Sequence, residues 1–135
     1  MILLNSLVKV KFISSTKGKG LFAKKEIQKG KIIDNAHVIL IPNKDYPLLE
    51  KTSVSNYCFV WENPKYKSEF KNAIAMSICQ FMNHSYNPNV RYQYNYKDDS
   101  IKFIALRKIM KDEELTVNYN GNVSDRSPVW FKVFD

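Results

Sequence analysis

The sequence predicts a mainly β fold with few short helices. Short apolar runs rich in valine, isoleucine and aromatic residues alternate with turns marked by glycine, proline and asparagine, which is the pattern of short strands. Helical spacing is weak and is confined to one proline-flanked segment. At 135 residues the chain has the length of one domain, and a single compact core is enough for it.

The first half of the chain is expected to consist mostly of strands, with Gly18, Gly20 and Gly30 as turn residues. The strands are expected at residues 8–12, 21–23, 32–33 and 38–41. Prolines then flank residues 46–59, where one or two short helical turns are expected. An apolar stretch follows at residues 73–82.

The second half repeats the β pattern. The expected elements are a turn at 83–89, a strand at 90–94, a hairpin turn at 94–100, a strand at 101–106 and a last strand at 115–119. Tyr119 would therefore end the last strand, and the apolar tail with Trp130 and Phe131 is expected to dock on the core. The sequence shows no internal repeat or linker, so residues 1–135 are expected to form one domain.

The net charge is +8, and eight lysines face a single acidic residue, Glu26, within the first 31 positions. A basic face would suit an acidic partner or nucleic acid, although a solvated lysine-rich surface explains it equally well. No apolar run approaches the roughly 20 residues that span a bilayer, so no membrane partner is expected. Because the opening residues lack signal-peptide features, we expect an intracellular location, either cytoplasmic or nuclear and chromatin-associated.

Metal binding is not expected. Cys58, Cys79, His37 and His84 are too few and too irregularly spaced for a zinc site. Both cysteines are expected to be reduced core residues.

Three short segments carry patterns that could form a ligand site. Residues 17–23 place two glycines where the backbone can turn tightly and approach a ligand without a Cβ, although alone this segment is more typical of a lysine-rich hairpin turn. Residues 81–89 include Asn83 and His84, whose side chains can satisfy an irregular buried backbone. Residues 112–121 place Tyr119 where its hydroxyl could enter a cleft, with an ordinary core tyrosine as the default.

Taken in order, these three segments resemble the signature motifs of the SET-domain lysine methyltransferases. The resemblance spans roughly residues 8–121 and includes the strand-turn-strand at 27–33. It implies a β-clip-like SET fold of small curved sheets with a knot-like crossing, in which the Asn83 segment threads beneath the loop that bears Tyr119. Residues 43–70 or so would be a variable insert, and residues 122–135 a C-terminal flank.

The resemblance also implies a function: transfer of a methyl group from S-adenosylmethionine (SAM) to the side-chain amine of a protein lysine, in a histone or another basic protein. SAM is the implied cofactor, and Tyr119 is the implied catalytic residue beside the lysine channel. The implied SAM-binding residues are Lys17, Gly18, Lys19, Gly20, Asn83, His84 and Trp130. The implied substrate-binding residues are Tyr57, Trp61 and Val117, with ordinary packing as the alternative for the two aromatic residues.

The chain departs from the family pattern at several positions. Val117 stands two residues before Tyr119, where phenylalanine or tyrosine is frequent and influences how many methyl groups are added, so the methylation state stays open. The zinc-binding cysteine cluster of some members is missing, and Trp130 and Phe131 are nominated for the last wall of the channel, with plain docking of the tail as an equal alternative. Other departures are Gln80, Tyr86, Asp112 and Asn118, where the family often has Arg, Cys, Gly and Asp.

A competing function is a catalytically inactive SET fold or a basic module that binds nucleic acid or protein. The first expected partner is a lysine-containing protein; nucleic acid is a weaker candidate, and a second copy of the chain could complete the groove. An enzyme with a net positive charge can still bind a basic substrate, because its substrate groove can be locally acidic. The acidic residues available for this are Glu62, Glu69, Asp98 and Asp99.

Overall fold

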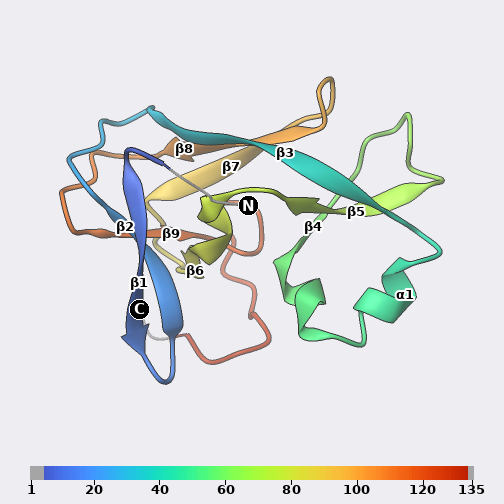
Figure 1. The fold of residues 1–135 in the computed structure, drawn as a ribbon, viewed down its shortest axis with the longest axis horizontal. Helices are drawn as coiled ribbons and strands as arrows, with labels where there is room; N and C mark the ends of the chain where they lie inside the picture. The colour runs from blue at the N-terminus through green and yellow to red at the C-terminus, as the bar shows by residue number, and fades with distance from the viewer. Residues whose placement is uncertain (1–4, 134–135) are drawn as a thin grey trace.

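A computed structural model describes residues 5–133 of the chain (Figure 1). Strands dominate, as the alternating pattern predicts, and the few helices are one turn long. The elements in chain order are β1 (Val8–Ser14), β2 (Gly18–Ala23), β3 (Ile32–Pro42), α1 (Tyr46–Leu49), the 3-10 helix η1 (Ser53–Tyr57), β4 (Cys58–Val60), β5 (Phe70–Ala75), the 3-10 helix η2 (Ile78–Phe81), β6 (Asn83–His84), β7 (Val90–Asn95), β8 (Ser100–Ala105) and β9 (Glu114–Val117).

The strands form two sheets. A four-stranded sheet has the order β1-β2-β9-β6, and a five-stranded sheet has the order β4-β5-β3-β8-β7. All pairings are antiparallel except that of β6 with β9, which is parallel and joins Asn83 to Thr116 and His84 to Val117. The four-stranded sheet lies on one side of Figure 1, and α1 with η1 lies on the other. The mainly β fold of curled sheets is thereby confirmed.

Most predicted strands are present, with different limits. The strands expected at 32–33 and 38–41 are one continuous strand, β3, which pairs first with β8, up to His37, and then with β5, from Val38. The apolar stretch expected from residue 73 begins inside β5, an unpredicted strand. Strand β9 ends at Val117, so the expectation that Tyr119 ends a strand is wrong, and Tyr119 lies in the turn that follows.

The core lies between the sheets and contains the inward-facing residues of the strands. In β8, for example, Ile101, Phe103 and Ala105 are buried, as the two-residue period of a strand requires. Cys79 is buried as expected, whereas Cys58 is only half-buried. Among residues 5–133, no helix is long and apolar enough to cross a bilayer.

Two connecting segments, residues 23–31 and 105–113, have the same backbone arrangement around an antiparallel bridge between Ile27 and Ile109. Each isoleucine donates its N–H to the other's carbonyl at 2.8 Å. The N–H of Gly30 donates to the carbonyl of Ala105 at 2.8 Å, and that of Asp112 donates to the carbonyl of Ala23 at 2.8 Å. Gly30 and Asp112 also share a positive φ, of 83° and 68°. The two segments thus share a backbone arrangement although few of their side chains are the same, which is why the sequence shows no repeat there.

Candidate active site

A cleft of about 1050 Å³ lies between the insert and the segment that follows β9. Its lining includes Tyr57 of η1, Asn83 of β6, Val117 of β9, and Tyr119 and Trp130 beyond β9. These residues are far apart in the sequence. The cleft therefore gathers residues from the second and third signature segments, the insert and the C-terminal flank.

Tyr119 is held at both its backbone and its hydroxyl. Its backbone N–H donates to His84 Nδ1 at 3.0 Å, and its hydroxyl donates to the Met82 carbonyl at 2.8 Å. Burial, followed by the nearby Tyr57 and Glu114, raises the pKa of Tyr119 to about 12. The hydroxyl therefore stays protonated at neutral pH, and its hydrogen is directed to Met82 while its lone pairs remain available.

An aromatic cluster surrounds Tyr119. Its ring stacks on Trp130 with 5.8 Å between centroids and an interplanar angle of 21°. Phe131 meets Tyr119 edge-on at 5.9 Å, and the buried His84 ring lies 5.3 Å from it. Trp130 is still 63% exposed, so the tail packs on Tyr119 without being absorbed into the core.

The polypeptide after β9 is tied back to the second signature segment and to the Tyr119 turn. The Tyr86 hydroxyl and Asn120 Nδ2 both donate to the Ser127 carbonyl, at 3.1 Å and 2.7 Å. The buried Asn118 side chain donates to the Asp125 carbonyl at 2.7 Å and accepts from the Asn120 N–H at 3.0 Å. These bonds fix the path that brings the aromatic tail back over Tyr119.

The first signature segment approaches the cleft through Asn83. Asn83 Nδ2 donates to the Lys19 carbonyl at 3.1 Å and to Glu114 Oε1 at 2.9 Å. A Cβ on Gly20 would lie 2.6 Å from Ile13 Cδ1 and 2.9 Å from Glu114 Oε1, so any larger residue there would displace the ends of these two side chains. Gly18 has a φ of +71° and open space around it, and both lysines beside it are exposed.

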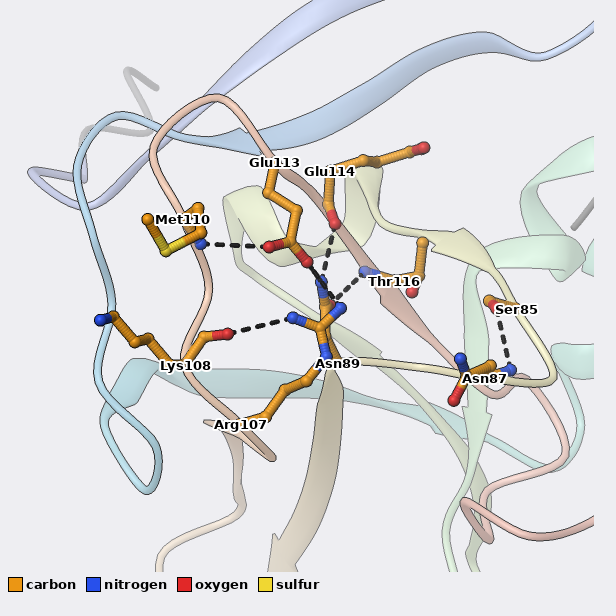
Figure 2. Close-up of polar contacts among 9 residues, drawn as sticks. All are labelled: Ser85, Asn87, Asn89, Arg107, Lys108, Met110, Glu113, Glu114 and Thr116. Atoms are coloured by element: carbon orange, nitrogen blue, oxygen red, sulfur yellow. Dashed lines mark hydrogen bonds and ion pairs between the residues drawn. The ribbon is translucent and has the colours of Figure 1, made fainter.

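The side chain of Asn89 ties β9 to the segment that precedes β7 (Figure 2). Its Nδ2 donates to Glu113 Oε2 at 3.0 Å and to the Glu114 carbonyl at 2.8 Å, and its Oδ1 accepts from the Thr116 N–H at 2.9 Å. Glu113 is in turn bound by Arg107, at 2.6 Å, which together with the other hydrogen bonds at that carboxylate lowers the pKa of the Glu113 carboxyl. The motif containing Asn89 was noted in the sequence, but this scaffolding role was not predicted.

The structure brings five of the eleven predicted site residues into one cleft, and it places the others outside its lining. Tyr57, Asn83, Val117, Tyr119 and Trp130 share the cleft. His84 lies directly behind Tyr119, and the segment from Lys17 to Gly20 lies next to Asn83 but outside the lining of the cleft. The Met82 carbonyl was missed, because a backbone acceptor leaves no signal in a side-chain pattern.

The prediction that Trp61 contacts the substrate is contradicted by its burial. Trp61 is 1% exposed and packs edge-on against Tyr94 and Tyr96 at 5.6 Å and 4.9 Å. Its size and apolar surface place it in the core, where it anchors the insert to β7. Among residues 5–133, no group of three His, Cys, Asp or Glu side chains is placed to hold a metal ion.

Comparison with known proteins agrees with this geometry. The family model of the SET domain matches residues 18–120. A histone-lysine N-methyltransferase of Schizosaccharomyces pombe, specific for H3 lysine-37, is 28% identical over 117 residues, which are 86% of this chain and 71% of that protein. The crystal structure of a candidate histone methyltransferase from Plasmodium falciparum superposes with a TM-score of 0.64 at 22% identity, covering 96% of this chain and all of the other. The fold is therefore shared, and the chain belongs to the SET-domain family.

Proposed function

We propose that the chain transfers a methyl group from SAM to the side-chain amine of a lysine in a protein, with Tyr119 as the catalytic residue. The observation that carries the proposal is the neutral Tyr119 hydroxyl, held in a cleft lined by two of the three signature segments. Membership of a family that includes a histone-lysine methyltransferase supports the reaction class.

Tyr119 acts by orientation. Because its hydrogen is given to the Met82 carbonyl, its oxygen can accept a hydrogen bond from the substrate amine and fix the direction of the nitrogen lone pair. With a pKa raised to about 12, the phenol is not a base at neutral pH, so the amine must lose its proton before the reaction by another route. Apolar and aromatic walls near Tyr119 assist, because poor solvation disfavours a charged ammonium.

The residues beside the cleft suit SAM. SAM, when bound, supplies a methyl group on a cationic sulfur. Lys17 and Lys19 would attract its carboxylate, and the face of Trp130 that Tyr119 leaves open would stabilise its positive charge. The complete set that would hold it is Lys17, Gly18, Lys19, Gly20, Asn83, His84 and Trp130. His84 would contribute chiefly by fixing the backbone of Tyr119, since its Nδ1 is already used there.

The proposed substrate is a lysine in a protein, with a histone as the first candidate because of the S. pombe relative. A chromatin location follows from that candidate. Tyr57, 54% exposed on the cleft, would contact the peptide, and the buried Val117 would border the end of the lysine side chain. Valine leaves more room there than an aromatic residue would.

The test is methyl transfer from radiolabelled SAM to histones and to a whole-cell protein extract, with Tyr119→Phe compared with the wild-type chain. We expect label on lysine that falls about fivefold or more in the variant, because one orienting hydrogen bond is worth about 1 kcal/mol or more. Tyr66→Phe is the matched control, since Tyr66 lies outside the cleft lining and should not matter. Undiminished transfer by Tyr119→Phe would refute the assignment, and binding of histone without any transfer would favour the inactive module.

A further inference from the structure

The cleft differs in charge from the rest of the molecule. The chain has 21 lysines and arginines against 13 acidic residues, and its net charge is +8. The described residues that line the cleft nevertheless include no lysine or arginine, and their two charged members are Glu50 and Glu62. A protein that is basic overall therefore presents an acidic cleft.

Both glutamates belong to the insert. Glu50 caps the C-terminal end of α1, and Glu62 follows β4 by two residues. Both are exposed, and neither forms an ion pair with another residue between positions 5 and 133. Of the acidic residues that the sequence offered for the groove, only Glu62 reaches it, and Glu69, Asp98 and Asp99 lie outside the lining.

The glutamates and the catalytic tyrosine come from different parts of the cleft lining, the insert and the segment after β9. Glu50 influences the pKa of Tyr46 at the start of α1, and Glu62 that of Tyr94 on β7, whereas neither is among the groups that raise the pKa of Tyr119. In Figure 1, α1 and β4 form the side of the molecule that faces β6 and β9. The two carboxylates thus come from the insert, which also contributes Tyr46, Tyr57 and Phe59 to the lining, whereas no carboxylate among the described residues of the lining comes from the segment that bears Tyr119.

This separation suits a cation other than the reacting lysine. A carboxylate beside the target amine would stabilise its protonated form, which cannot attack a methyl group. Carboxylates that belong to the insert, away from the Tyr119 segment, do not stabilise the protonated form of the target amine. They can instead bind a second positive charge on the same peptide. Arginine fits best, because its guanidinium can bind a carboxylate through two parallel hydrogen bonds.

We propose that Glu50 and Glu62 are specificity-determining residues, which select substrates carrying a basic residue, preferably arginine, close to the target lysine in sequence. The inference rests on the proposed function, because it assigns the cleft to a lysine-containing peptide. The overall positive charge of the protein would repel such a peptide, and the local negative potential of the cleft overcomes this repulsion where binding occurs.

The experiment uses fluorescein-labelled eleven-residue peptides with one central lysine and with arginine, glutamine or glutamate at the flanking positions. Dissociation constants come from fluorescence anisotropy with the full chain, and KM and kcat come from methyl transfer with the same peptides. We expect the arginine peptide to be preferred over the glutamine peptide, and Glu50→Gln and Glu62→Gln each to reduce that preference about two- to fivefold, in Kd and KM rather than in kcat. Glu69→Gln, an exposed glutamate outside the cleft, is the matched control and should change nothing.

Reversing the charge of Glu62 gives an independent test, because a gain in binding cannot result from a loss of folding. Glu62→Lys should bind the glutamate-flanked peptide more tightly than the wild-type chain does, and rising salt should weaken both preferences. The inference is overturned if the two Gln variants keep the wild-type preference, or if Glu69→Gln changes it as much. If no peptide is methylated but the charge preference in binding follows Glu50 and Glu62, the inference stands and the proposed catalytic function fails.

Discussion

Replacing Asn89 by alanine should destabilise the whole domain. Asn89 is 2% exposed, and its side chain makes three hydrogen bonds to β9 and the residue before it. Each such bond contributes about 1 kcal/mol net, so their loss should lower the free energy of unfolding by about 3 kcal/mol. For a domain of this size, that corresponds to a fall in Tm of about 10 °C.

Urea denaturation followed by circular dichroism at pH 7 measures the effect. Asn87→Ala is the matched control, because Asn87 is exposed on the same turn, and its substitution should change stability by less than about 0.5 kcal/mol. Asn89→Asp is a sharper probe: it keeps an acceptor for the Thr116 N–H but places a second carboxylate where the Asn89 amide lies 3.0 Å from Glu113 Oε2. That variant should be least stable near pH 7 and should recover part of its stability as the pH falls and the added carboxyl becomes protonated. If Asn89→Ala is as stable as Asn87→Ala, the network does not hold β9 and the reasoning is wrong.

Three further predictions concern single positions. Asp112→Ala should lower the free energy of unfolding by about 1 kcal/mol, because the φ of Asp112 is 68°. Asp112→Gly should leave it unchanged, since glycine adopts this φ freely, and urea denaturation measures both variants. Gly20→Ala should lower the free energy of unfolding by about 1 kcal/mol or less in the same assay and weaken SAM binding in calorimetry, because its Cβ would displace the side-chain ends of Ile13 and Glu114. The folded pKa of Tyr119, about 12, exceeds the unfolded value of about 10, so the contribution of this group to stability is intact below pH 10 and is lost as the pH rises through 12. Tyr119→Phe should make that alkaline loss shallower in urea midpoints measured from pH 9 to 12.

Local patterns predicted the strands well where alternation and turn residues coincide, as in β7 and β8. They failed for β5, because its buried alanines carry little apolar signal and its pairing with β3 and β4 is a long-range contact. The shared backbone arrangement of residues 23–31 and 105–113 was also not predicted, because the same backbone hydrogen bonds can form between segments whose side chains differ.

The part of the candidate site that lies in the three signature segments could be predicted from the sequence. Tyr119, Asn83 and His84 were selected from their order in the sequence, and the structure brings them together. Trp61 was misjudged, because an aromatic residue in an insert has the same sequence signal whether it faces a groove or the core. Glu50 was not selected at all, since only the packing of α1 beside the cleft gives its charge a position.

The parallel pairing of β6 with β9 has a consequence for how the site forms. Two residue pairs join these strands, and the strands are separated in the chain by the whole of β7 and β8 and the connections between them. So short a pairing cannot persist alone, and it gains stability only after the chain between the two strands has folded. The contacts of His84 with Tyr119 should thus be among the last to form and the first to open, and hydrogen exchange at the Tyr119 amide would report directly on the assembly of the proposed catalytic site.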